Sequence, residues 1–137
     1  MISGIGHVAI RCSDLAESLR FYTEVLGLRK AFELTRDDGS VWLVYLQISK
    51  DVFIELFPGG KDANKITGSS IGFTHLCLQV DDMQATLAHL AAKGLDVGEP
   101  TMGADGNWQY WIKDPDGVPI ELMQIMPDSM QRRHSRF

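Results

Sequence analysis

Alternating apolar and polar residues near the amino terminus predict a β-strand that begins at His7. Side chains of a strand point to its two faces in turn, so His7 and Arg11 share one face while Val8 and Ile10 share the other. An apolar stripe at steps of four, three and four follows and predicts an amphipathic helix: Leu15, Leu19, Tyr22 and Leu26. The chain therefore starts as a strand followed by a helix.

The same pattern recurs 68 residues later. A second strand is predicted to open at His75, and the spacing of seven residues from each histidine to an aspartate, Asp14 or Asp82, is the same in both copies. A second helical stripe matches the first step for step: Met83, Leu87, Leu90 and Gly94. Repetition of a whole strand and helix indicates an internally duplicated fold.

Each copy closes with a strand that contains the tripeptide Ile-Glu-Leu, at 54–56 and 120–122. Four further strands are predicted: 29–36, 40–48, 95–99 and 107–113. A polar segment rich in Gly, Lys, Asn and Ser, 58–70, links the copies. We expect one α+β domain over 1–137. It has two tandem β-α-β-β-β modules, about 4–58 and 71–126, that form a curled mixed sheet, and a basic tail at 127–137 that either is disordered or docks onto a partner chain.

Local signals define the ends of the helices and one turn. Asp14 with Glu17 three residues later resembles a capping box, and Gly27 and Gly94 stand where helices commonly end. The segment Asp114–Gly117 is predicted to be a tight turn, with Pro and Gly supplying its backbone angles. We expect a structural role for this turn and no chemistry.

Composition narrows the classes of partner. The net charge of −5 gives no basic surface for nucleic acid or an anionic membrane, and no apolar run reaches the roughly 18 residues that cross a bilayer. Without a leader pattern of basic and apolar residues at the amino terminus, the expected location is the cytoplasm. Cys12 and Cys77 are too few for a disulfide scaffold and are expected to be reduced. A small-molecule substrate is the expected partner.

Glu55 and Glu121 each interrupt an apolar strand. Burying an unpaired carboxylate costs several kcal/mol, so each glutamate requires a partner. Strand alternation places both on the side away from the helices, as it does His7 and His75. Alone, a strand histidine is more often exposed or hydrogen bonded, and a strand glutamate more often lies at a sheet edge. Recurrence of both at matched positions favours one shared site, which forms if the sheets curl into a trough.

The four side chains have the composition of a metal site. Two imidazoles and two carboxylates suit Ni²⁺, Co²⁺, Zn²⁺, Fe²⁺ or Mn²⁺ and do not distinguish among these ions. In an octahedral shell, four protein ligands leave two positions for water or for two substrate oxygens, which is typical of a catalytic site. The sequence thus predicts one divalent ion per site with the ligands His7, Glu55, His75 and Glu121.

These features resemble the vicinal oxygen chelate superfamily and, within it, the metal-dependent glyoxalase I (lactoylglutathione lyase) family. The resemblance covers most of the chain. It rests on segments that occur in the family's order: His7, Phe21-Tyr22, Leu26–Leu28, Ile54–Leu56, Thr74-His75, Val80–Asp82, Asp114–Gly117 and Ile120–Leu122. The complete His, Glu, His, Glu set is the feature specific to the metal-dependent isomerases.

The resemblance implies a reaction and residue roles. A 2-oxoaldehyde thiol hemithioacetal would become a 2-hydroxyacyl thioester through an enediolate held by the metal. Glu121 would act as the base that moves the proton, and Glu55 would remain mainly a ligand or assist. Arg11 matches a position that binds the glutathione carboxylate in bacterial relatives, although it could equally make a surface ion pair. A homodimer is implied as well, with modules paired within one chain or between two.

Two alternatives remain open. Gly59 stands where glutathione-using members tend to have Asn, and the 102–110 region is aromatic and lacks a second cationic anchor. These departures favour an epimerase or isomerase that acts on another vicinal-oxygen substrate. The other alternative is a metal-free module that binds a drug or metabolite on the same fold. Such a module has no reason to keep two histidines and two glutamates in register.

Overall fold

The chain folds into two compact units, Met1–Ala63 and Asn64–Phe137. The structure is a computed structural model that describes residues 1–136. Phe137, the last residue of the predicted tail, lies outside the described residues. The boundary between the units falls inside the 58–70 segment that joins the two copies of the sequence pattern.

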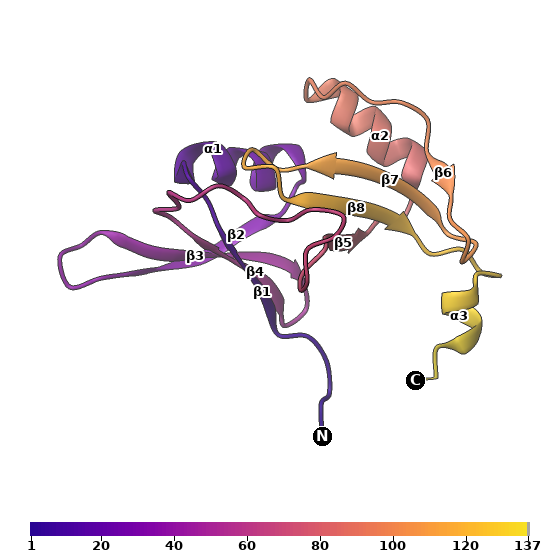
Figure 1. The fold of residues 1–137 in the computed structure, drawn as a ribbon, viewed down its shortest axis with the longest axis horizontal. Coiled ribbons are helices and arrows are strands. Elements are labelled where there is room, and N and C mark those ends of the chain that lie inside the picture. Colours follow the sequence, from indigo (N-terminus) through magenta and orange to yellow (C-terminus); the bar gives the residue numbers. More distant parts are fainter. Residues whose placement is uncertain (137) are drawn as a thin grey trace. The chain divides into compact units, whose positions relative to one another are not determined.

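The first unit is a four-stranded mixed sheet with one interrupted helix (Figure 1). Its elements are β1 (His7–Arg11), α1 (Leu15–Arg20), the π-helix η1 (Phe21–Val25), β2 (Arg29–Thr35), β3 (Val41–Ser49) and β4 (Val52–Phe57). The strand order is β1-β4-β3-β2. The first and last strands of the unit, β1 and β4, are parallel neighbours, whereas the other pairs are antiparallel.

The second unit repeats this arrangement. Its elements are β5 (Leu76–Gln79), α2 (Met83–Ala92), β6 (Thr101–Met102), β7 (Trp108–Lys113), β8 (Pro119–Gln124) and α3 (Met130–His134). The strand order β5-β8-β7-β6 corresponds to that of the first unit. The first and last strands of the unit, β5 and β8, are again parallel neighbours. This confirms the predicted α+β fold of two β-α-β-β-β modules, each with its own four-stranded mixed sheet.

Both helices begin where the sequence predicts, because an aspartate caps each one. The Asp14 carboxylate accepts a hydrogen bond from the Glu17 N–H at 3.0 Å, and Asp82 accepts one from the Ala85 N–H at 2.9 Å. These bonds satisfy N–H groups that have no partner within the helix. At the end of α2 the chain turns through Gly94 at φ +92°, a conformation that glycine adopts without a steric penalty.

Aliphatic side chains on the helix-facing side of each sheet form the two cores. Ile54 and Ile120, which flank the two glutamates, are fully buried. The second helical stripe is buried as predicted at Met83, Leu87 and Leu90. The first stripe differs: Leu15, Leu19 and Leu26 are only partly buried, and the second half of this helix is the π-helix η1. The side chains buried by the first helix are Ser18, Phe21, Tyr22 and Val25, so only Tyr22 of the predicted stripe is fully inside.

The predicted strand at 95–99 is wrong. The structure has no strand there; the edge strand β6 is only Thr101–Met102. Pro100 precedes it and has no N–H to donate to a ladder, and the Gly98 N–H donates to the Tyr110 hydroxyl at 2.8 Å instead of to a neighbouring strand. The other predicted strands are present, with ends that differ by one or two residues.

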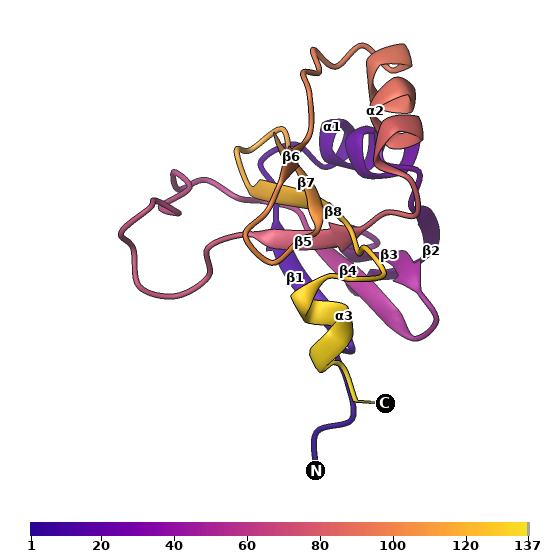
Figure 2. The ribbon, with the colours of Figure 1, turned by 90° about the vertical axis from the view of Figure 1, so that its right-hand side faces the viewer.

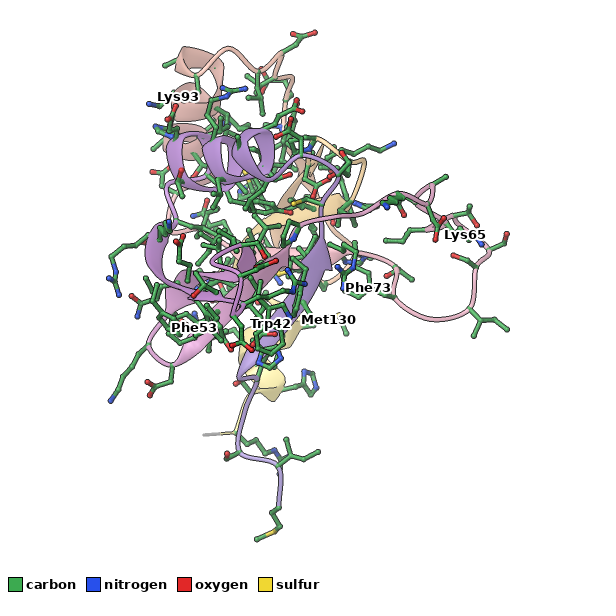
Figure 3. All side chains as sticks on the ribbon, turned by 90° about the vertical axis from the view of Figure 1, so that its left-hand side faces the viewer. Trp42, Phe53, Lys65, Phe73, Lys93 and Met130 are labelled. Atoms are coloured by element: carbon green, nitrogen blue, oxygen red, sulfur yellow. The ribbon has the colours of Figure 1, made fainter. Side chains whose placement is uncertain are left out.

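Two segments lie outside the sheets. In the second unit the linker loop that carries Lys65 projects away from β5 (Figures 2 and 3). The helix α3 lies beyond the carboxyl end of β8, and Ser129 caps it by accepting from the Arg132 N–H at 3.1 Å. Part of the predicted tail is thus ordered helix. No helix within residues 1–136 has the length and apolar character required to span a membrane.

Candidate metal-binding site

The parallel pairing of β1 with β4 brings His7 beside Glu55. Phe53 is the register partner of His7, and Glu55 is that of Ala9, so the histidine and the glutamate are diagonal neighbours on one face. His7 Nε2 lies 3.4 Å from Glu55 Oε2. The imidazole is half exposed, at 51%, whereas the carboxylate is largely buried, at 11%. The buried glutamate therefore presents one oxygen to an accessible ring nitrogen.

The other oxygen of Glu55 accepts a hydrogen bond from Tyr45, its cross-strand neighbour on β3. The Tyr45 ring stacks on Phe32 at a centroid distance of 4.2 Å and meets the edge of Phe53 at 5.8 Å. The hydrogen bond to the carboxylate raises the pKa of Tyr45, with desolvation adding to the effect. The phenol is therefore held as a protonated donor.

The second unit contains the equivalent pair. His75 lies one residue before β5, and Glu121 is the register partner of Cys77, so the diagonal relation is the same. His75 Nε2 and Glu121 Oε2 are hydrogen bonded at 3.0 Å. The other ring nitrogen, Nδ1, lies 2.9 Å from the Thr74 hydroxyl. The Trp111 indole meets the imidazole edge-on at 4.7 Å.

Cys77, an exposed residue of β5, lies beside Glu121. Burial, together with the charge of Glu121 and a hydrogen bond to it, raises the pKa of the Cys77 thiol to about 11. Cys12, the other cysteine, is fully buried. Neither forms a disulfide, as the sequence predicted. The thiol next to Glu121 is therefore neutral at physiological pH.

Arg11, the predicted substrate-binding residue, lies at the end of β1 on the same face as His7. Its Nη1 donates to the Pro58 carbonyl at 2.9 Å, and its guanidinium lies 5.2 Å from the centre of the Phe57 ring. No carboxylate of the described residues is paired with it. The surface ion pair that the sequence left open is therefore not formed, and an exposed cation remains at this end of the strand.

Each unit thus assembles one histidine and one glutamate. Ligand nitrogen and oxygen atoms about 2.1 Å from an ion lie about 3.0 Å apart at right angles and about 3.4 Å apart at the tetrahedral angle. The observed separations, 3.4 Å for His7 and Glu55 and 3.0 Å for His75 and Glu121, match this range. Both pairs therefore have the donor atoms and the spacing to share an ion. Among residues 1–136, no three or more His, Cys, Asp or Glu side chains are grouped so that they could hold a metal.

Sequence reasoning missed the residues that support these pairs: Tyr45, Thr74, Cys77 and Trp111. One signal was available. Tyr45 and Trp111 are separated by the same 66 residues as Glu55 and Glu121, which places both aromatic residues at one position of the duplicated unit. The sequence does not state which strand pairs with which, so their contact with the glutamates became visible only in the sheet register.

Residues 4–122 match the family described as the Glyoxalase/Bleomycin resistance protein/Dioxygenase superfamily. A probable lactoylglutathione lyase of Vibrio cholerae serotype O1 is 35% identical over 123 residues, which cover 86% of this chain and 88% of that protein. The uncharacterized protein YaeR of Escherichia coli K12 is 31% identical over 88% of this chain and 95% of its own. Human mitochondrial methylmalonyl-CoA epimerase is 29% identical over 88% and 73%, respectively.

The fold also matches solved structures. The glyoxalase family protein from Enterococcus faecalis superposes with a TM-score of 0.74 at 26% identity, covering 88% of this chain and 96% of that one. The agreement extends over nearly the whole chain, including both modules. Both kinds of similarity therefore cover the two strands that carry each histidine and glutamate.

Proposed function

The chain belongs to the glyoxalase/bleomycin resistance protein/dioxygenase superfamily, and we propose that within it the chain is a metal-dependent isomerase of the glyoxalase I (lactoylglutathione lyase) type. The proposed reaction converts a 2-oxoaldehyde thiol hemithioacetal to a 2-hydroxyacyl thioester. The observation that carries the proposal is the histidine and glutamate pair that recurs at the same diagonal position in both units. Relatives named probable lactoylglutathione lyase at up to 35% identity support it.

The proposed ligands are His7, Glu55, His75 and Glu121, supplied by the two modules of one chain or by a homodimer. A bound divalent ion, Ni²⁺, Co²⁺, Zn²⁺, Fe²⁺ or Mn²⁺, would act as a Lewis acid that polarises two neighbouring substrate oxygens. Neutral imidazoles and carboxylates suit all five ions. The paired spacing within each unit supports the ligand assignment because it is the spacing of two atoms that bind one ion.

Glu121 is the proposed base. It takes the proton from one carbon of the hemithioacetal and returns it to the neighbouring carbon, which requires a carboxylate oxygen within reach of both. Its burial in a strand of aliphatic residues excludes water that would otherwise exchange with this proton. Glu55 is proposed to remain mainly a ligand or to assist as a second base. Arg11 would bind an anionic group of the thiol, for which its guanidinium is exposed.

The metal content of the purified protein, followed by an ultraviolet assay, tests the proposal. The assay follows thioester formation from methylglyoxal and glutathione with added Ni²⁺, Co²⁺ or Zn²⁺. The expected result is metal-dependent thioester formation that Glu121→Gln lowers by at least about 100-fold, the scale of general-base catalysis. The matched control is Glu99→Gln, which changes an exposed glutamate of the same unit and should leave the rate unchanged. Metal-replete protein that forms no thioester would contradict the proposal.

One alternative has an observation in its favour. The similarity to methylmalonyl-CoA epimerase, together with Gly59 where glutathione-using members tend to have Asn, favours an epimerase or isomerase for another vicinal-oxygen substrate. Proton exchange at a carbon next to a carbonyl uses the same base and the same metal chemistry. Bound metal without glutathione-dependent turnover, and solvent deuterium incorporation at C2 of a methylmalonyl (2-carboxypropanoyl) thioester, would distinguish this function.

A further inference from the structure

The two glutamates differ in the residue that faces them across the sheet. Tyr45 on β3 pairs with Glu55, whereas Trp111 on β7 pairs with Glu121. These four residues occupy matching positions of the duplication, because 111 − 45 and 121 − 55 are both 66. One position of the repeated unit therefore carries a phenol in the first module and an indole in the second.

In the first module the phenol holds the carboxylate. The Tyr45 hydroxyl donates to Glu55 Oε1, while Oε2 faces His7 Nε2 at 3.4 Å, so the two oxygens have separate partners. The Tyr45 ring packs between Phe32 at 4.2 Å and Phe53 at 5.8 Å, the latter on β4, the strand of Glu55. Rotation of the Glu55 carboxylate would break the hydrogen bond, and the stacked ring cannot follow it.

In the second module, none of the hydroxyl groups of residues 64–136 holds the Glu121 carboxylate. Within the described residues, Trp111 makes no hydrogen bond to Glu121; its ring contacts His75 at 4.7 Å instead. Besides the His75 nitrogen, Glu121 is contacted by the Cys77 thiol, and a thiol is a weak donor. Once both histidine nitrogens bind the ion, Glu55 would keep the bond from the Tyr45 hydroxyl, whereas Glu121 would keep only the weaker bond from the Cys77 thiol.

We propose that Tyr45 is a positioning residue that fixes Glu55 as the carboxylate that stays on the metal and thereby leaves Glu121 as the one that moves the proton. This inference rests on the proposed function and assigns different roles to two ligands at equivalent positions of the duplicated unit. To accept a proton, Glu55 Oε1 would have to give up the Tyr45 hydroxyl. Glu121 would have to give up only the weaker bond from the Cys77 thiol. The difference in mobility follows from one cross-strand side chain and requires no difference between the glutamates themselves.

Tyr45→Phe tests the assignment because it removes the hydroxyl and keeps the stacked ring. Calorimetric titration of the full chain with Co²⁺ should show an affinity about 10-fold weaker, the usual effect of losing an outer partner of a metal ligand. The visible absorption spectrum of bound Co²⁺ should change as well. The matched control is Tyr110→Phe, which removes a tyrosine hydroxyl bonded to the Gly98 N–H and should leave both readouts unchanged. Unchanged Co²⁺ affinity and spectrum in Tyr45→Phe would overturn the inference.

Turnover in a second background separates positioning from stability. Adding Tyr45→Phe to Glu121→Gln frees Glu55, so thioester formation should rise at least several-fold above that of Glu121→Gln alone. No rise overturns the assignment of unequal roles. Wild-type protein that binds Co²⁺ but forms no thioester overturns the proposed reaction, whereas the Co²⁺ comparison of Tyr45→Phe with Tyr110→Phe still decides whether Tyr45 fixes Glu55. Wild-type protein that binds no Co²⁺ overturns both.

Discussion

The hydroxyl of Thr74 lies 2.9 Å from Nδ1 of His75, on the side of the ring opposite Glu121. With a metal ion on Nε2 in place of the bond to Glu121, Nδ1 would carry the proton and donate it to this hydroxyl, and outer hydrogen bonds of this kind fix the ring of a metal-ligating histidine. Two adjacent residues thus determine which way a proposed ligand faces.

Replacing Thr74 by valine keeps the shape of the side chain and removes this hydroxyl. We expect the affinity for Co²⁺ to fall by about 10-fold because the His75 ring loses its orienting partner. Isothermal titration with Co²⁺ measures the change. Thr101→Val, on the exposed edge strand β6 of the same unit, is the matched control. Equal affinity in Thr74→Val and wild type would show that the ring is held by other contacts.

The turn before β8 depends on one buried carboxylate. Asp114 accepts hydrogen bonds from the Asp116 N–H at 2.9 Å and the Val118 N–H at 2.8 Å. Asp114→Ala leaves these donors without their charged acceptor, so we expect the free energy of unfolding to fall by about 3 kcal/mol. Urea unfolding gives the value. Asp96→Ala, an exposed aspartate in the same unit, should change it by less than about 0.5 kcal/mol.

Cys77 should react slowly with alkylating reagents in metal-free protein. Because burial and Glu121 raise its pKa from 9.0 to about 11, the reactive thiolate at pH 8 is about 100-fold scarcer than for an unperturbed thiol. Iodoacetamide labelling of folded and urea-unfolded protein, with mass spectrometry to locate the label, measures the ratio. Labelling of folded Cys77 at the unfolded rate would be the contrary result.

The same shift makes stability depend on pH. The folded protein holds the Cys77 proton more tightly than the unfolded chain does. The stabilising effect is therefore complete below about pH 9 and is lost as the pH rises through the folded pKa of about 11. Unfolding free energies measured between pH 8 and 11 should fall more steeply for wild type than for Cys77→Ser. Parallel curves would contradict the assignment of the shift to this thiol.

Asn107 connects the β6–β7 loop to the carboxyl-terminal helix. Its Oδ1 accepts from the Met126 N–H at 2.9 Å, and its Nδ2 donates to Gln131 at 3.2 Å and to Asp105 at 2.8 Å. Asn107→Ala should lower the free energy of unfolding by about 2 kcal/mol, because the partly buried Met126 N–H loses its acceptor. Amides of Met130–His134 should also exchange hydrogen faster. Gln131→Ala removes only one of these bonds and should have the smaller effect.

The sequence by itself determined the features that depend on neighbouring residues. Strand alternation placed His7 on the face opposite Ile10, and Asp14 and Asp82 capped their helices within a single turn. These relations span a few residues and are set by backbone geometry. The repeats, at an offset of 68 residues for the histidines and 66 for the glutamates, gave long-range information that local patterns do not contain. They identified two equivalent modules and, with them, one histidine and one glutamate in each.

Only the tertiary structure decided which side chains meet across strands. Glu55 contacts Tyr45 because β3 pairs with β4 in one register, and a shift of one residue would turn Tyr45 to the other face. No local pattern fixes that register. For the same reason, the predicted strand at 95–99 was wrong: Pro100 and the Gly98 bond to Tyr110 prevent pairing there, and Tyr110 becomes a neighbour only after β7 has joined the sheet.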